Sequence, residues 1–110
     1  MEKFAFLFHG GRGAESPEVM QSRMQKWFVW VEQLRKDGTY VAGEPLHEGG
    51  RKVTGPGKVV TDGPFTEAKD IIGGFIIVNA NNYNEAVVMA KDYPDYNNGG
   101  TVEIRQVMKM

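Results

Sequence analysis

Residues 3–9 read Lys-Phe-Ala-Phe-Leu-Phe-His, and a helix-forming stretch follows them between Ser16 and Gly38. Phenylalanines at every second position of residues 3–9 give the period-two pattern of a strand, which Gly10 ends. Ser16 is of the residue type that caps helices, Pro17 suits the first helical position, and Gly38 is a C-terminal stop. A strand followed by a long helix is therefore expected.

Apolar residues recur in this helix at three- and four-residue spacing, so one of its faces is apolar. They are Met20, Met24, Trp27, Phe28, Val31 and Leu34.

The second half of the chain predicts several strands and one more helix. Short strands are expected at Thr39–Gly43, Arg51–Thr54 and Lys58–Thr61, separated by turn residues. The continuous apolar run Phe75–Ala80 indicates a central strand, and residues 101–108 alternate as a last one. Asn82 and Glu85 have the spacing of a helix start; Tyr83, Ala86, Val87 and Ala90 would form its buried stripe, up to a stop at Pro94.

This order predicts an α+β fold of ferredoxin-like type, with two helices on one face of a mostly antiparallel sheet, in a single domain over residues 1–110. Phe75 and Ile77 point opposite to Ile76 and Val78, so both faces of the sheet are apolar. Because the helices cover only one face, a second copy is expected to cover the other. We therefore expect an obligate homodimer.

Charge and composition exclude several classes of partner. Thirteen Lys and Arg against 14 Asp and Glu give a formal net charge of -1, with no basic block to attract nucleic acid or an anionic membrane. The chain has no cysteine, hence no disulfide and no thiol nucleophile. The apolar stretch near the N-terminus is too short for a signal peptide, so a cytoplasmic location is expected.

Residues 61–70 read Thr-Asp-Gly-Pro-Phe-Thr-Glu-Ala-Lys-Asp and must turn sharply. Asp62 can accept hydrogen bonds from amides of its own loop, and Pro64 fixes its own φ. In one interpretation the loop is only rigid, with Phe65 as a hydrophobic plug. In the other, the loop is a pocket wall that presents Asp62 and Glu67.

The sequence resembles the YCII-related family in its DGPF-motif branch, over essentially the whole chain. The resemblance rests on the 61–70 motif, on Gly-Gly-Phe at 73–75, Gly-Glu-Pro-Leu at 43–46 and Val-Glu-Ile-Arg at 102–105, and on the Trp-containing first helix that ends at Gly38. It implies a ferredoxin-like fold paired into a dimeric α+β barrel, related to muconolactone-isomerase-like enzymes. It also implies that some relatives are linked to alternative sigma factors of transcription.

Other members of the broader family carry a His in the first helix and an Asp before a Pro near the end of the second helix, proposed as a catalytic pair. Trp27 and Tyr93 occupy the corresponding positions here, so the pair is absent. Any acid-base chemistry would have to come from groups of the DGPF segment itself.

Asp62 and Glu67 are the acid-base candidates, with His47 as a general base that Asp62 could orient. The alternative for His47 is an exposed loop histidine. His9 is expected to have a capping or dimer-contact role.

Arg23 lies four residues before Trp27 and could hold an anionic ligand against an aromatic wall that includes Phe65 and Tyr93. The alternatives are an arginine that stacks on Trp27 at the surface, and core positions for Trp27, Trp30 and Tyr93. Glu103 and Arg105 share a strand face and are expected to form a surface ion pair.

Known motifs for phosphate, dinucleotide, metal or serine-hydrolase sites do not occur in the sequence. We therefore expect no cofactor and no metal. One hypothesis is a cofactor-free homodimer that binds a small organic molecule beside residues 61–70, with isomerase- or lactone-type chemistry. The other is a non-catalytic dimeric interaction module, associated with transcription control, in which the DGPF segment is purely structural.

Overall fold

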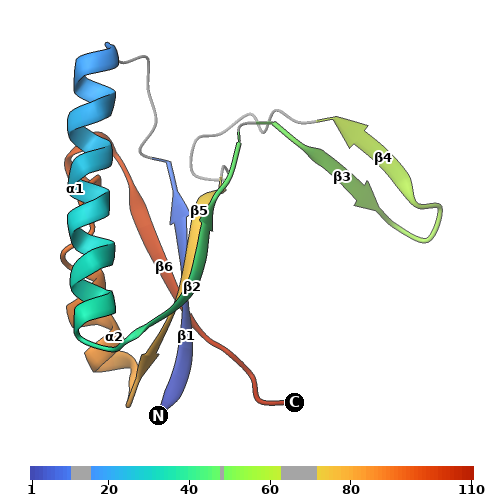
Figure 1. Cartoon of the computed structure of the whole chain (residues 1–110). Coiled ribbons are helices and arrows are strands. Elements are labelled where there is room, and N and C mark those ends of the chain that lie inside the picture. The colour runs from blue at the N-terminus through green and yellow to red at the C-terminus, as the bar shows by residue number, and fades with distance from the viewer. Residues whose placement is uncertain (11–15, 48, 63–71) are drawn as a thin grey trace.

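Four strands and two helices form the body of the protein, and two further strands form a hairpin beside it (Figure 1). The computed structural model describes residues 1–10, 16–47, 49–62 and 72–110. The body consists of β1 (Glu2–His9), α1 (Pro17–Lys36), β2 (Tyr40–Pro45), β5 (Ile72–Ala80), α2 (Tyr83–Ala90) and β6 (Thr101–Gln106). The hairpin pairs β3 (Arg51–Thr54) with β4 (Val59–Asp62), and a short 3-10 turn, η2 (Tyr96–Asn98), precedes β6.

The main sheet has the strand order β2-β5-β1-β6, and every neighbouring pair is antiparallel. Helix α1 connects β1 to β2 and helix α2 connects β5 to β6, each crossing over one intervening strand. This is the ferredoxin-like arrangement, and the predicted α+β fold is confirmed. The β3–β4 hairpin is inserted between β2 and β5.

Helix α1 begins and ends as its sequence predicts. The Ser16 hydroxyl accepts a hydrogen bond from the Val19 amide at 3.3 Å, and Pro17 is the first helical residue. Gly38 follows the helix with a φ of +75°, which glycine adopts without strain.

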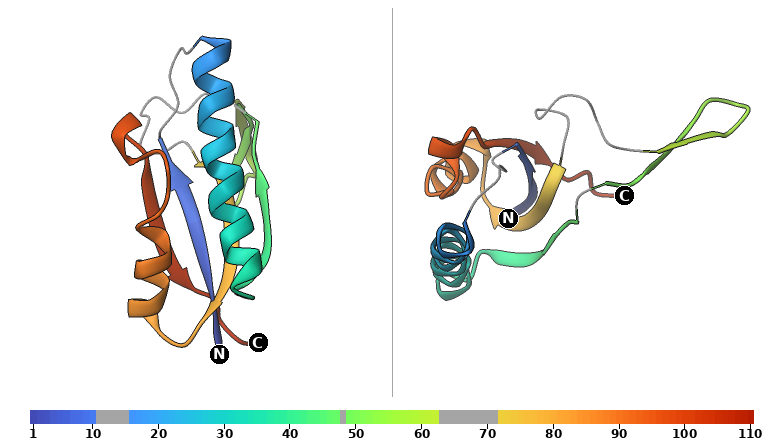
Figure 2. Two further views of the ribbon diagram at one scale, coloured as in Figure 1. Left: turned by 60° about the vertical axis from the view of Figure 1, so that its left-hand side comes forward. Right: turned by 90° about the horizontal axis from the view of Figure 1, so that it is seen from above.

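Both helices cover the same face of the sheet, and the core lies between them and the strands (Figure 2). Alternate residues of β1 and β5 point into it, and Phe4 and Phe6 are fully buried. The buried hydrophobic residues are Phe4, Phe6, Phe8, Trp30, Leu34, Ile76, Val78, Ala80, Ala86, Ala90 and Tyr93.

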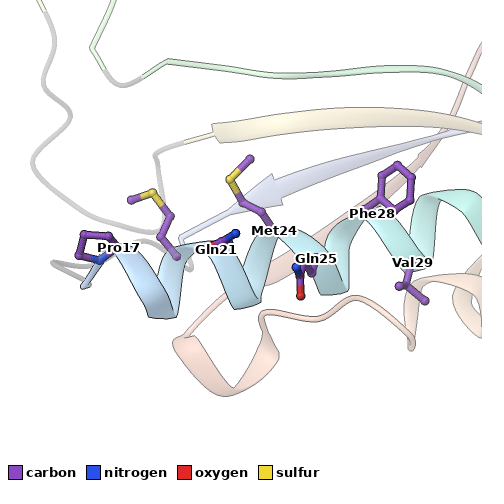
Figure 3. Close-up of a pocket in the computed structure, with 7 residues that line it drawn as sticks. Pro17, Gln21, Met24, Gln25, Phe28 and Val29 are labelled. Carbon is purple, nitrogen blue, oxygen red and sulfur yellow. The ribbon is translucent and has the colours of Figure 1, made fainter.

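Only part of the apolar face of α1 is buried. Trp30 and Leu34 are buried, and Trp27 and Val31 pack against the core, but Met24 is 63% exposed and Phe28 is 67% exposed. Because successive helical residues turn by about 100°, a flat sheet contacts only one sector of the helix. Met20, Met24 and Phe28 are exposed along an adjacent sector of α1, where Figure 3 shows Met24 and Phe28.

Helix α2 starts as predicted and ends earlier. The Asn82 side chain accepts from the Glu85 amide at 2.9 Å, while the Glu85 carboxylate accepts from the Asn81 amide. The helix ends at Ala90 instead of continuing to Pro94, and Lys91 and Asp92 form a turn after it. Of the predicted stripe, Ala86 and Ala90 are buried, whereas Tyr83 and Val87 are exposed.

The other face of the main sheet carries no helix (Figures 1 and 2). Leu7 pairs with Phe75, and Ala5 pairs with Ile77, at its centre. These four residues are half-buried by their neighbours, and no helix among the described residues covers them. We call this surface the open sheet face.

Candidate functional site

A buried carboxylate, Asp95, connects α1 to the segment between α2 and β6. Asp95 is only 4% exposed. Its Oδ2 accepts a hydrogen bond of 2.6 Å from Trp27 Nε1. Its Oδ1 lies 3.5 Å from Arg23 Nε and accepts a 3.3 Å bond from Asn98 Nδ2. A buried charge is costly unless it is paired and hydrogen-bonded, and Asp95 meets both conditions.

The local backbone holds Asp95 in place. Its carbonyl oxygen accepts hydrogen bonds from the amides of Asn98 and Gly100, both at 3.0 Å. The Tyr96 hydroxyl donates to the Ala90 carbonyl at 2.7 Å. Burial raises the pKa of the Tyr96 phenol, so this group stays protonated and remains a donor at neutral pH. The turn around Asp95 is thus fixed from both sides.

Four aromatic rings pack against one another beside this carboxylate. Trp27 and Tyr93 meet edge to face with centroids 5.3 Å apart, and Phe8 stacks on Tyr93 at 5.2 Å. Trp30 completes the group at 5.5 Å from Trp27. Phe8, Trp30 and Tyr93 are buried, whereas Trp27 is half-buried.

Arg23 faces the same Asp95 carboxylate as Trp27, and 18% of its side chain is exposed. The combination of a guanidinium group held by a buried carboxylate and an aromatic surface beside it suits a planar anion. We call Arg23, Trp27, Tyr93 and Asp95 the Arg23–Asp95 cluster.

The cluster lies near one end of the sheet, where several connections meet. His9, the last residue of β1, pairs with Ile72 at the start of β5 and with Thr101 at the start of β6. The chain therefore returns from the DGPF segment to the sheet at Ile72, beside the strand that carries Phe8.

Three polar side chains contact one another at this end of the open sheet face. His9 Nε2 is 3.0 Å from Glu103 Oε1, and Arg105 is 3.3 Å from the other Glu103 oxygen. The predicted Glu103–Arg105 pair on the strand surface is confirmed, and it extends to His9.

The structure brings together three of the sequence-predicted ligand residues, Arg23, Trp27 and Tyr93. Asp62 is elsewhere: it lies on the β3–β4 hairpin, its side chain is 75% exposed, and it pairs with Arg51 at 2.9 Å. His47 is exposed, just after β2. Phe65 and Glu67, the remaining candidates, lie outside the described residues.

Asp95 is the residue that sequence reasoning missed. It is 68 positions from Trp27 along the chain, so spacing could not link the two. The available signal was an acidic residue directly after Pro94 and before Gly99-Gly100, a context in which a carboxylate often organises a turn. Trp27 and Tyr93, which replace the proposed catalytic pair of other family members, do lie in contact.

The described residues contain neither a metal-binding group of side chains nor a membrane-spanning helix. Over residues 1–10, 16–47, 49–62 and 72–110, no group of three or more His, Asp or Glu side chains is placed to hold a metal ion. Neither of the helices described is long and apolar enough to cross a membrane.

Comparison with known proteins places the chain in a family. No curated protein matches its sequence. Among solved structures it is similar to the 5-chloro-2-hydroxyhydroquinone dehydrochlorinase TftG of Burkholderia phenoliruptrix AC1100, in complex with 2,5-dihydroxybenzoquinone. The TM-score is 0.51 at 17% identity, with 96% of this chain and 93% of the dehydrochlorinase covered, so the likeness is one of fold. The family model of the YCII-related domain matches residues 3–110, and the chain belongs to that family.

Proposed function

We propose that the protein binds a small, planar, acidic organic molecule, such as a hydroxylated quinone, phenol or lactone acid, at the Arg23–Asp95 cluster beside the DGPF segment. The observation that carries this proposal is the pairing of Arg23 with a carboxylate that is itself 4% exposed. Asp95 fixes the guanidinium group before any ligand arrives, which lowers the entropic cost of binding.

The dehydrochlorinase of similar fold supports this ligand class. Its bound 2,5-dihydroxybenzoquinone is a flat ring with acidic hydroxyl groups and carbonyl oxygens. A guanidinium group donates to such oxygens in a fork, and an indole offers a face or edge to the ring. Arg23 and Trp27 supply these two groups from neighbouring turns of α1.

The chemistry we propose is proton transfer without a cofactor. A carboxylate would take a proton from a carbon next to a carbonyl group, and Arg23 would stabilise the negative oxygen that results. Return of the proton to another carbon gives isomerisation, and departure of a leaving group gives elimination. Glu67 is the proposed acid-base group at the cluster, with Phe65 and Tyr93 as ring contacts. Asp62, which pairs with Arg51 on the hairpin, and the exposed His47 lie away from the cluster of their own chain, so we propose an acid-base role for them only at the cluster of a second copy.

We further propose that the functional unit is a homodimer that pairs two open sheet faces, Ala5, Leu7, Phe75 and Ile77 of each copy. Aligned packing of two sheets would bury these apolar side chains. Sedimentation equilibrium of the purified chain at micromolar concentration is expected to give twice the 12.3 kDa monomer mass. A stable monomer at that concentration would rule the pairing out.

Binding is tested first by thermal shift with a panel of hydroxylated quinones, phenols and lactone acids. A ligand that binds only the native state at about 100 times its dissociation constant adds about 2.7 kcal/mol of stability. Arg23→Gln is expected to lose most of that shift, because it removes the charged, forked donor and leaves a shorter neutral amide. If the whole panel, including its acidic members, gives no shift, the ligand proposal is wrong.

One observation favours the alternative, a non-catalytic interaction module associated with sigma-factor transcription control. Asp62 pairs with Arg51 on an exposed hairpin, as a structural or interface residue would. In that case Asp62→Asn would change the association of the protein with its partner and leave small-molecule binding unaltered.

A further inference from the structure

The β3–β4 hairpin projects from the body of the protein. It forms a sheet of its own, and each residue of β3 and β4 is exposed. Figures 1 and 2 show that it extends away from both helices, on the side of the open sheet face. A two-stranded hairpin is only marginally stable alone in water. We call this hairpin, residues 51–62, the arm. We expect that packing against another surface stabilises it.

The protein exposes more surface than a compact monomer of its mass. Its accessible surface is 7968 Å², whereas about 6100 Å² is typical for 12.3 kDa. Its radius of gyration is 15.4 Å, against about 13 Å for a compact domain of this length. Two copies could together hide an excess of about 3700 Å², which lies in the range of permanent homodimers.

One face of the arm is apolar and electrically neutral. The register pairs Val53 with Val60 and, next to them on the same face, Arg51 with Asp62. Val53 is 64% exposed and Val60 is 61% exposed. The Arg51–Asp62 ion pair at 2.9 Å neutralises the charge beside the two valines. We call this surface of the arm, with Val53 and Val60 at its centre, the valine face. Its exposure to water is unfavourable, because the side chains are apolar and carry no net charge.

A matching surface lies along α1. Seven residues of α1 line a shallow, open pocket of about 630 Å³ that contains the exposed Met24 and Phe28 and no charged residue (Figure 3); we call it the α1 groove. Residues four apart on a helix are about 6 Å apart along its axis, and the Cβ atoms of a cross-strand pair are about 5 Å apart. The two valines therefore match the spacing between Met24 and Phe28.

The arm does not reach this groove in its own chain, because it projects to the side opposite α1 (Figure 1 and the right-hand view of Figure 2). In a pair formed through the open sheet faces, the helix layer of the other copy begins about 10 Å beyond that copy's sheet. An arm about 20 Å long spans that distance.

We propose that the arm of each protomer docks, through Val53 and Val60, in the α1 groove of a second copy, so that two protomers exchange arms reciprocally. The inference rests on the homodimer of the proposed function and adds which surfaces meet. It also joins the arm of one copy to the helix that carries Arg23 in the other.

The absence of cysteine from the chain permits a clean crosslinking test. The double variant Met24→Cys with Val60→Cys, treated with a short bis-maleimide, is expected to give a covalent dimer in high yield. The matched control, Met24→Cys with Val59→Cys, moves the second cysteine to the opposite face of the arm, because Val59 pairs with Thr54. The control is expected to crosslink at least fivefold less.

Each outcome separates the arm exchange from the homodimer itself. A sedimentation dimer in which both variants crosslink equally, or not at all, would overturn the exchange and leave the open-face pairing standing. Crosslinks within one chain would show that the arm occupies its own groove, and a ladder of higher oligomers would exclude reciprocal exchange.

As a second measure, Val53→Ser with Val60→Ser is expected to raise the dimer dissociation constant at least tenfold, and Val59→Ser alone by less than threefold. Equal effects would contradict the proposal.

Discussion

Replacement of Asp95 by alanine is expected to lower the free energy of unfolding by about 3–5 kcal/mol, the range for breaking a buried, hydrogen-bonded ion pair. The change leaves Trp27 Nε1 without its 2.6 Å acceptor and removes the carboxylate that faces Arg23. In a domain of this size the midpoint of thermal unfolding should fall by about 12 °C or more. Urea denaturation at fixed protein concentration measures the loss.

Asp92 provides the control, since it is an exposed aspartate three residues earlier in the same connection. Asp92→Ala removes the same charge and is expected to change stability by less than about 0.5 kcal/mol. If the two variants unfold at the same urea concentration, the Asp95 contacts contribute nothing to the fold, and the preorganisation of Arg23 loses its physical basis.

The second large effect is expected at Gly100, where the chain passes closely over the same cluster. A Cβ at this position would collide with the Tyr93 hydroxyl and lie 2.9 Å from the Asp95 carbonyl oxygen. Backbone atoms give way little, so Gly100→Ala should cost about 2–3 kcal/mol through overpacking. Differential scanning calorimetry of the variant measures this cost.

Gly57→Ala is the matched control for Gly100→Ala. Gly57 lies in the turn of the arm, where an added Cβ would meet only Val59 Cγ2 at 3.9 Å. That substitution is expected to change stability by less than about 0.5 kcal/mol. A Gly100 variant as stable as the Gly57 variant would show that Tyr93 is free to move, contrary to its packing against Trp27 and Phe8.

Much of the fold follows from local patterns in the sequence. The alternation in residues 3–9, the cap at Ser16 and the pair Asn82 and Glu85 each predict an element that the structure contains. These signals are strong because they arise within one element, from the geometry of a strand or from the free amides of a helix start.

The spacing of apolar residues does not predict how much of the apolar surface of a helix is buried. Phe28 has helical spacing from Met24, yet both side chains are exposed. The sheet contacts only the sector that holds Trp30 and Leu34, and that sector depends on how the helix packs. The apolar character of Met24 and Phe28 is explained if another surface covers them.

The site was predictable only in part. The sequence indicated Arg23, Trp27 and Tyr93 through their chemical types, and the structure places them together. Asp95, which holds them, could not be linked to them because the contact depends on how α1 packs against the α2–β6 connection. Long-range contacts of this kind depend on tertiary packing. Secondary-structure propensity and hydrophobic periodicity describe only local structure, so they do not predict such contacts.

Isothermal titration calorimetry with 2,5-dihydroxybenzoquinone provides the direct test of the Arg23–Asp95 cluster as a ligand site, on the wild-type chain, Arg23→Gln and Lys26→Gln. Lys26 is an exposed cation on the same helix, so its variant removes the same charge outside the cluster. The wild type and Lys26→Gln should bind one molecule per chain with similar affinity, and Arg23→Gln should bind at least about tenfold more weakly, since a hydrogen bond to a charged group contributes about 1.5–3 kcal/mol. No binding to the wild type, or equal binding to all three proteins, would contradict the assignment of this site.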